Sequence, residues 1–498
     1  MLAVAAGGVA ACGGASEHEP PPIAGEPGAP ALVVQDDSEL LYAPPRRVSR
    51  ALELLRRSGV RTVRLTAGWS VLAPRPRAAQ RPRFDQSDPA AYEPEAWSRL
   101  DRAVRGARRR GMAVMIDLAF WAPVWATDDD TSKRPRRGVN PVLFGRFAGA
   151  VARRYDGRYD PPGAAGRLPA VRGYTIWNEP NLPDFLRPQW RDPQTKRVPL
   201  SPHSYRRMVE AAYPAVKAVQ PESLVLVGGL AAYGRRGGVA PLRFVRELAC
   251  VDAHMQPLRR PDCAGFRGVA GDGFAYHPYS TRTRPDRVER TAQADDAPLA
   301  RIGALATLLD RLATDGRIDS RLRDLYLTEY GYETDPPDPG APFDPPLASR
   351  MSSWAEAIAA REARVRTVAQ FLVRDLPAGP GAQREGRLSD WQSGVLFLDG
   401  RPKPLAAALP APLHAEPGPP GRIRIWARVR PGAGRRRVRI ETVQSGGASR
   451  VAFEGLTDER GVLELSIPGA PETLVRIARR AGDGWLRGRL VDVIAPGG

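Results

Sequence analysis

Short apolar runs alternate with longer amphipathic stretches along most of the chain after residue 30. Eight such runs can be counted, each typical of a buried strand: Ala31–Gln35, Thr62–Thr66, Ala113–Leu118, Val171–Trp177, Leu224–Val227, Gly273–Tyr276, Leu325–Thr328 and Gly394–Leu398. Between the runs, apolar residues recur every three or four positions, as Val48, Ala51, Leu52 and Leu55 do, which is the spacing of a buried helix face. The pattern predicts repeated strand–helix units around a parallel sheet.

Eight strand–helix units favour a closed barrel over an open sheet, so the expected class is α/β and the expected fold a (β/α)8 TIM barrel over residues 31–412. That span exceeds the roughly 250 residues of a minimal barrel. The excess lies in the connections after the strands, which build the active site in barrel enzymes. We therefore expect an elaborate cleft at that end.

The pattern changes after the Pro- and Gly-rich stretch 410–421. Apolar residues then alternate with polar ones at every second position, as at Ile423, Ile425 and Ala427. This is the period of a half-buried strand. We expect residues 422–498 to form a small antiparallel, sandwich-like β domain, and no constellation in it suggests chemistry.

The first twelve residues are small and apolar and end in Val9-Ala10-Ala11-Cys12, too short a stretch to span a bilayer. They resemble a bacterial lipoprotein signal, in which Cys12 would become the lipidated first residue of the mature chain. Residues 13–30 are rich in Gly, Pro and Glu and predict a disordered linker. The resemblance implies an extracellular or cell-envelope protein anchored to the membrane through Cys12. An alanine-rich tail, or a start further upstream, is the alternative.

Two further cysteines, Cys250 and Cys263, lie thirteen residues apart. In an exported protein this pair predicts a disulfide that closes a loop. Two separately buried thiols are the alternative. A metal site is less favoured, because His254 alone does not complete a set of four ligands at a recognisable spacing. We expect neither a metal nor an organic cofactor.

Composition and charge exclude some classes of protein. Of the 498 residues, 42% are hydrophobic and 26% charged, an ordinary globular mix that excludes wholesale disorder. The net charge of +19 invites a nucleic-acid interpretation. However, nearly all the basic residues are arginines spread along predicted helices, without the interleaved aromatic residues that stack bases. We expect solvated basic faces and no nucleic-acid partner; the sequence indicates no oligomeric state.

Two carboxylates occupy equivalent positions at the ends of predicted strands. Glu179 follows the fourth strand in Tyr174-Thr175-Ile176-Trp177-Asn178-Glu179-Pro180, and Glu329 follows the seventh in Leu325-Tyr326-Leu327-Thr328-Glu329-Tyr330-Gly331. In a ring of eight strands these positions face each other across the mouth. Paired carboxylates are what glycoside hydrolysis requires, one to protonate the leaving oxygen and one to attack the anomeric carbon or activate water.

These motifs resemble those of glycoside hydrolase clan A, barrel enzymes whose acid/base and nucleophile glutamates end strands four and seven. Trp177-Asn178-Glu179-Pro180 is similar to the acid/base motif, which implies that Glu179 donates the proton and Asn178 binds the sugar 2-hydroxyl. Thr328-Glu329-Tyr330-Gly331 is similar to the nucleophile motif and gives that role to Glu329. The competing carboxylates Glu333 and Asp335 lie beyond the strand end.

The resemblance extends to three more residues. His277-Pro278-Tyr279 after the sixth strand is similar to the His-x-Tyr element of the clan, whose tyrosine contacts the nucleophile, and Arg64 matches the arginine that keeps the nucleophile ionised. The alternative for His277 is a histidine of the core, and the alternative for Arg64 is a structural ion pair. Families 39 and 5 both fit, which implies a carbohydrate substrate with β linkages.

The two glutamates need opposite protonation states. A positive Arg64 would lower the pKa of Glu329, while burial and the negative charge of Glu329 would raise the pKa of Glu179. Retention of configuration is expected if the carboxyl groups lie about 5–5.5 Å apart, and inversion if they lie about 6.5–9.5 Å apart. We predict retention.

Several tryptophans follow predicted strand ends, where flat rings could stack on sugars. We single out Trp391 for a sugar subsite, although packing under a loop explains any one of them equally well. Two other functions remain open: a barrel that has lost turnover and only binds polysaccharide at the cell envelope, and a basic surface that binds an anionic polymer.

Overall fold

A closed barrel of eight parallel strands forms the centre of the computed structural model, which describes residues 21–129, 133–163, 166–377, 391–430, 434–443 and 447–495. The strands are β1 (Ala31–Gln35), β2 (Thr62–Gly68), β3 (Ala113–Ala119), β4 (Gly173–Ile176), β5 (Leu224–Ala231), β6 (Gly273–His277), β7 (Leu325–Leu327) and β8 (Val365–Phe371). β8 pairs with β1, from Ala31 opposite Thr367 to Gln35 opposite Phe371, and so closes the ring. The predicted TIM barrel is confirmed.

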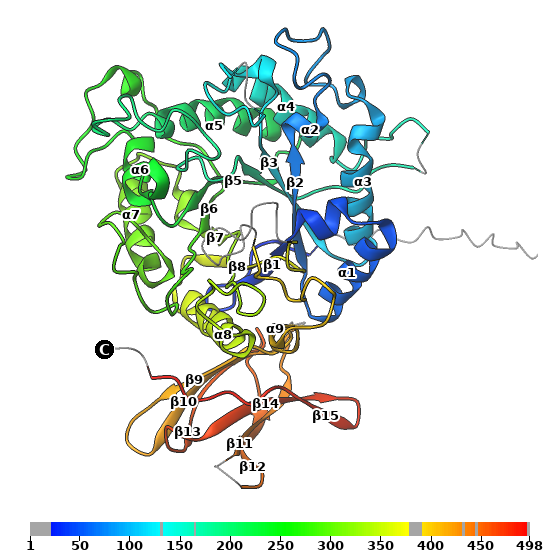
Figure 1. Ribbon diagram of the computed structural model, residues 1–498, viewed down its shortest axis with the longest axis vertical. Helices are drawn as coiled ribbons and strands as arrows, with labels where there is room; N and C mark the ends of the chain where they lie inside the picture. Colours follow the sequence, from blue (N-terminus) through cyan, green and yellow to red (C-terminus); the bar gives the residue numbers. More distant parts are fainter. Residues whose placement is uncertain are drawn as a thin grey trace, which may run out of the picture.

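Helices surround the ring of strands (Figure 1). They are α1 (Pro45–Arg57), α2 (Trp69–Leu72), α3 (Pro94–Arg108), α4 (Pro141–Arg154), α5 (Ser201–Lys217), α6 (Pro241–Leu248), α7 (Ile302–Thr314), α8 (Pro345–Arg361) and α9 (Pro404–Ala408). Many begin with proline. Proline fits the first helical position because a backbone N–H there would have no acceptor within the helix, so its loss costs nothing. Asn140 and Asp344 cap α4 and α8 by accepting from Leu143 N and Leu347 N. The longer helices bury an apolar face, as α1 does with Val48, Ala51, Leu52 and Leu55.

The prediction of the eighth strand was wrong. β8 is Val365–Phe371, and Gly394–Leu398 lies in the long connection after it. The sequence did not predict this strand because it contains polar residues. In the structure these residues donate hydrogen bonds to backbone carbonyls, Thr367 to that of Leu327 and Gln370 to that of Ser393. A polar residue is tolerated in a barrel wall when its hydrogen bonds are made.

Part of the expected N-terminal linker packs against the barrel. Ile23 is 4% exposed and joins Met115, Leu226 and Tyr326 in a separate apolar cluster. A Cβ on Gly173 of β4 would lie 2.4 Å from the Ile23 side chain, so a glycine is needed there. For residues 21–30 the linker prediction is therefore wrong, because one isoleucine provides an anchor. Cys12, the segment 1–12 and the rest of the predicted linker up to residue 20 lie outside the described residues.

The C-terminal part is an antiparallel β domain, as predicted. It has a three-stranded sheet in the order β13-β10-β9 and a four-stranded sheet in the order β12-β11-β14-β15. The strands are β9 (Leu413–Pro417), β10 (Arg422–Arg428), β11 (Arg437–Val443), β12 (Arg450–Leu456), β13 (Val462–Pro468), β14 (Leu474–Ala481) and β15 (Gly484–Arg487). Residues of both sheets share one core that includes Ile425, Val438, Leu463 and Ile477. β9 precedes the expected start at residue 422, since its Leu413 and Ala415 belong to that core.

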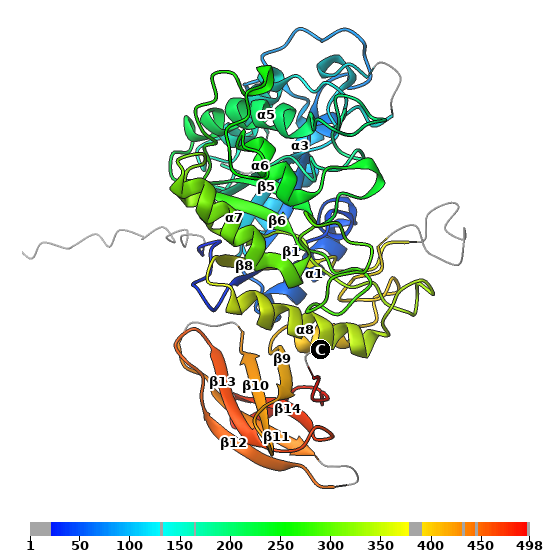
Figure 2. The same ribbon diagram turned by 90° about the vertical axis from the view of Figure 1, so that its left-hand side faces the viewer.

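The β domain docks on helix α8 beside the barrel (Figures 1 and 2). Trp426 of β10 faces away from the domain core and packs with Ala357 and Ala360 of α8. Trp354 of α8 stacks on His414 of β9, with ring centroids 4.9 Å apart. No helix within the described ranges is long and apolar enough to cross a membrane.

Candidate active site

The strand ends bring Glu179 and Glu329 together. Glu179 lies three residues beyond β4, and Glu329 two residues beyond β7. Trp177 and Glu179 have left-handed backbone angles, with φ of 63° and 40°, and the Glu179 amide donates to the Gly229 carbonyl at 2.9 Å. Such strained angles persist only where surrounding contacts hold them, and they cluster at functional sites. One oxygen of each carboxyl group and a ring nitrogen of His277 all lie within 4.8 Å of one another.

Glu329 receives two direct hydrogen bonds. Arg64 Nη1 of β2 lies 2.9 Å from Glu329 Oε1, and Tyr279 Oη donates to Oε2 at 3.3 Å. Burial raises the pKa of Tyr279 well above its usual value, so this hydroxyl stays a donor. Burial also raises the pKa of Glu329, and the positive charge of Arg64 opposes that rise.

A polar network beneath the glutamates holds Arg64 in place. The guanidinium is fully buried and lies 2.9 Å from Asp117 Oδ1 of β3; it also contacts Gln35 and Thr175. Burial opposes its charge, but Asp117 and Glu329 leave the pKa of Arg64 above its usual value. Sequence reasoning missed Asp117, although a charged residue inside the apolar run Ala113–Leu118 was the available signal.

The imidazole of His277 lies between the two carboxyl groups. Its Nδ1 is 3.0 Å from Glu179 Oε1 and 3.8 Å from Glu329 Oε2. Burial lowers the pKa of His277 to about 4, so the ring is neutral at pH 7. Burial raises the pKa of Glu179 to about 8, an effect that Arg64 reduces, so Glu179 holds a proton at the same pH. The two glutamates therefore differ in their contacts: Glu179 has a neutral ring, and Glu329 has a cation and a hydroxyl.

An aromatic wall adjoins Glu329. Trp391, Phe371 and Tyr330 surround the Tyr279 ring, and the Trp391 centroid is the nearest at 5.0 Å. Trp391 is half-buried, so part of it is accessible to a ligand. In contrast, Trp69 and Trp177 are fully buried, and Trp69 stacks on Phe147 in the core.

The remaining residues named from the sequence differ in exposure. Asn178, next to Glu179, is 4% exposed, and its Oδ1 has no hydrogen-bond partner among the described residues. Asp335, a competing carboxylate four residues after Gly331 in the sequence, is exposed.

A buried lysine that the sequence did not reveal fixes the connections next to the site. Lys403 Nζ donates to Thr334 Oγ1 (2.8 Å), Asp375 Oδ1 (2.7 Å) and the Gln392 carbonyl (2.7 Å). These partners come from the segments that follow β7 and β8. The lysine therefore fixes the backbone next to Trp391.

The structure joins Cys250 and Cys263 by a disulfide with an S–S distance of 2.08 Å. The described residues contain two groups of side chains spaced to hold a metal ion. One is His203 with these two cysteines, whose sulfurs are already bonded to each other. The other is Glu179, His277 and Glu329, where Arg64 supplies a positive charge to Glu329. A cation would compete with that arginine.

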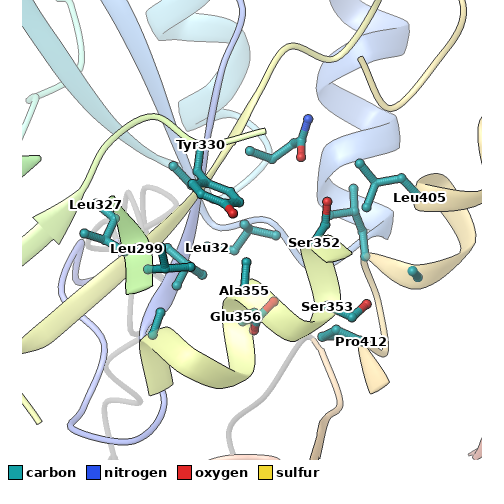
Figure 3. A pocket seen from close by; sticks show the side chains of 16 residues that line it. Leu32, Leu299, Leu327, Tyr330, Ser352, Ser353, Ala355, Glu356, Leu405 and Pro412 are labelled. Atoms are coloured by element: carbon teal, nitrogen blue, oxygen red, sulfur yellow. The ribbon is translucent and has the colours of Figure 1, made fainter. Parts of the chain in front are cut away.

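An apolar pocket of about 40 Å³ lies between α8 and the strands β1, β7 and β8 (Figure 3). Leu32, Leu327, Tyr330 and Ala355 are among its lining residues. This volume accommodates water but not a sugar ring. The pocket is a packing gap in the wall of the barrel and does not include the two glutamates.

No family model and no curated protein sequence matches the chain. Among solved structures, an exo-β-1,4-mannosidase from Opitutaceae bacterium strain TAV5 is 15% identical, with a TM-score of 0.43; the match covers 76% of this chain and 58% of the mannosidase. A GH5_18 protein from Streptomyces cattleya is 18% identical (TM-score 0.45, covering 78% of this chain and 79% of its own). A GH5-4 endoglucanase from Clostridium acetobutylicum is 11% identical (TM-score 0.41, covering 76% and 94%). At these identities a likeness concerns the fold, and function is inferred from the site itself.

Proposed function

We propose that this protein is a retaining β-glycoside hydrolase that cleaves a β-linked oligo- or polysaccharide, with Glu329 as nucleophile and Glu179 as acid/base. The observation that supports this most is the pair of carboxyl groups, Glu329 buried and Glu179 partly buried, with oxygens within 4.8 Å of each other and with different neighbours. Double displacement needs two carboxyl groups at short range, one anionic and one protonated.

The neighbours of the pair favour one proton distribution. Arg64 contacts Glu329 and stabilises its anion, while Tyr279 donates to the same carboxylate. Among the described residues, Glu179 has no cation within ion-pair distance other than the weakly basic His277, and burial raises its pKa to about 8. We place the single shared proton on Glu179, where it can move to the leaving glycosidic oxygen.

The short separation favours retention. One oxygen of each carboxyl group lies within 4.8 Å of the other. This supports the about 5–5.5 Å typical of retaining enzymes rather than the about 6.5–9.5 Å that makes room for the water of an inverting enzyme. Glu329 attacks the anomeric carbon as Glu179 protonates the leaving oxygen. Once Glu329 is esterified its negative charge is gone, the pKa of Glu179 falls, and its carboxylate accepts a proton from the incoming water.

Two further groups would bind the sugar. The unpartnered Asn178 Oδ1 is placed next to the acid/base and can accept from a sugar hydroxyl. Trp391 offers a half-buried ring beside Tyr279 for stacking on a sugar face. The preference for β linkages follows from the resemblance to clan A.

We also propose export, with lipidation at Cys12. The Cys250–Cys263 disulfide supports export, because disulfides persist mainly in oxidising compartments. Expression of the gene in a bacterial host and mass spectrometry of the purified protein test this proposal. Cleavage before Cys12 with an added diacylglycerol and acyl mass is expected, and an unprocessed N-terminus in the cytosolic fraction would contradict it.

The activity is tested on a panel of aryl β-glycosides and β-linked polysaccharides. Wild type should release product, Glu329→Ala should not, and azide should restore turnover in Glu329→Ala with an α-glycosyl azide as the product. No turnover of any substrate, together with equal polysaccharide binding by wild type, Glu179→Ala and Glu329→Ala, would contradict the proposal. That outcome would favour a barrel that only binds polysaccharide.

A further inference from the structure

The C-terminal β domain contains a cleft of about 320 Å³ whose lining is almost entirely cationic. Six arginines and one valine line it: Arg430, Arg435, Arg436, Arg437, Arg479, Arg480 and Val429. No carboxylate is among the lining residues. This arginine cleft lies at one end of the domain, where Arg430 after β10, the start of β11 and the end of β14 come together.

Arg479 shows that the cleft is more than a solvated surface. On β14, Val475 and Ile477 are buried in the domain core, and Arg479 is the next residue on the same face of the strand. It pairs in register with the buried Val438. Arg479 is half-buried, and its side chain makes no ion pair or hydrogen bond with the described residues. A charge at such a position is costly unless an anion compensates it.

Nearby carboxylates neutralise only part of the charge. Arg430 pairs with Glu356 of α8, Arg435 lies 3.0 Å from Glu459, and Arg437 lies 2.9 Å from Glu454. Arg480 adds a further positive charge to the cleft, and its guanidinium carbon lies 5.8 Å from the centroid of the Trp485 ring. Cations in a concave surface reinforce one another's field, so the cleft attracts anions more strongly than the same charges would on a flat surface.

We propose that the arginine cleft binds a polysaccharide bearing carboxylate groups, such as a chain of uronic acids. Arginine binds carboxylates through two parallel hydrogen bonds, and several arginines around one cleft can bind more than one carboxylate of the same chain. The lining has no aromatic ring on which a nucleic-acid base could stack. This proposal does not depend on the proposed glycosidase activity.

The location of the cleft makes it an anchoring site rather than part of the catalytic site. Arg428, two residues before Arg430, donates to the Ala29 carbonyl at 3.2 Å, just before β1 begins. The cleft therefore lies toward the end of the barrel where strands begin, whereas Glu179 and Glu329 lie where strands end. A bound acidic chain would hold the enzyme on a polymer without occupying the mouth of the barrel.

Binding is measured by calorimetric titration of polygalacturonate, polyphosphate and a neutral β-glucan into the full chain carrying Glu329→Gln, which prevents hydrolysis. The double variant Arg479→Gln/Arg480→Gln is compared with Arg450→Gln/Arg489→Gln. The control removes the same charge from two exposed arginines of the same domain that lie outside the cleft. Thermal unfolding checks that both variants are folded.

We expect the cleft variant to raise the Kd for polygalacturonate by about tenfold or more and the control by less than about twofold. Affinity should also weaken as salt is added. Equal losses in both variants would overturn the proposal in favour of general charge attraction, and no binding at all would overturn it outright. Binding of polyphosphate but not polygalacturonate would overturn the choice of ligand. With Glu329 restored, activity on small aryl glycosides should be the same in proteins that carry either double variant.

Discussion

The mouth of the barrel and the arginine cleft both concentrate charge, but in opposite ways. At the mouth, the buried Arg64 lies between Asp117 and Glu329, so the cation is matched by anions of the protein itself. In the cleft, arginines converge without a carboxylate among the described lining residues, and the side chain of the half-buried Arg479 makes no ion pair or hydrogen bond with the described residues. The first arrangement fixes reacting groups in one geometry. The second leaves an anion to be supplied by a ligand.

The largest effect is expected at the mouth, from Glu329→Ala. Removal of a nucleophile should lower kcat/KM on an aryl β-glycoside by on the order of 10⁴-fold or more, because the covalent route is lost. Asp335→Ala is the matched control, since Asp335 is a nearby but exposed carboxylate. A comparable loss in the control would contradict the assignment of Glu329.

The next largest effect is expected from Glu179→Gln. Wild-type kcat/KM should fall as the pH rises through about 8, because Glu179 then loses the proton it must donate. The variant should lose about 10²–10⁴-fold in kcat/KM on substrates with poor leaving groups. Its pH profile should also lack the alkaline limb. An unchanged alkaline limb would show that another group supplies the proton.

The same carboxyl group should affect folding. Its pKa is raised from 4.5 to about 8 in the folded protein, so the native state binds the extra proton and the free energy of unfolding falls as the pH rises between these values. Glu179→Gln should reduce this slope. Urea unfolding at about pH 5 and about pH 8 measures it for both proteins, and equal slopes would mean that Glu179 is ionised in the folded state.

Replacing one arginine in each region tests the comparison directly. Arg64→Met should destabilise the protein by about 3–5 kcal/mol, because it leaves the buried Asp117 and Glu329 without their cation. The measurement is urea unfolding at pH 7. A cost below about 1 kcal/mol, typical of an exposed ion pair, would contradict the view that Arg64 is an integral part of the site.

The smallest effect is expected from Arg480→Gln in the cleft. Its removal relieves repulsion among like charges, so stability should change by less than about 0.5 kcal/mol and should rise slightly at low salt. Unfolding in low-salt and high-salt buffers checks the sign. A loss as large as that of Arg64→Met would mean that the cleft arginines hold the fold together.

The sequence revealed most of the fold and only part of the site. Apolar runs located seven of the eight barrel strands, because their neighbours in the wall are apolar as well. The eighth, Val365–Phe371, was missed because Arg366, Thr367 and Gln370 find partners only in the folded protein. Ile23 was assigned to the linker because its packing partners are also distant in sequence. The residues around it do not show that Gly173 leaves space for its side chain.

Within the site, residues next to strand ends were identifiable because position and motif coincide there. Glu179, His277, Tyr279 and Glu329 belong to this group. The first two lie close to Glu329, and Tyr279 donates a hydrogen bond to it. Asp117 and Lys403 act through partners distant in sequence, Arg64 and Asp375 respectively. The sequence shows neither pairing, although the charged Asp117 stands out inside an apolar run.

The most direct test of the central claim is to trap the covalent intermediate. A panel of 2-deoxy-2-fluoro β-glycosides with dinitrophenyl leaving groups is incubated with the wild-type protein, and peptides are mapped by mass spectrometry. The account predicts one added glycosyl mass, located on Glu329 and absent from Glu329→Ala. Labelling of a different residue, or turnover of natural-type substrates with inverted products and no labelled protein, would contradict it.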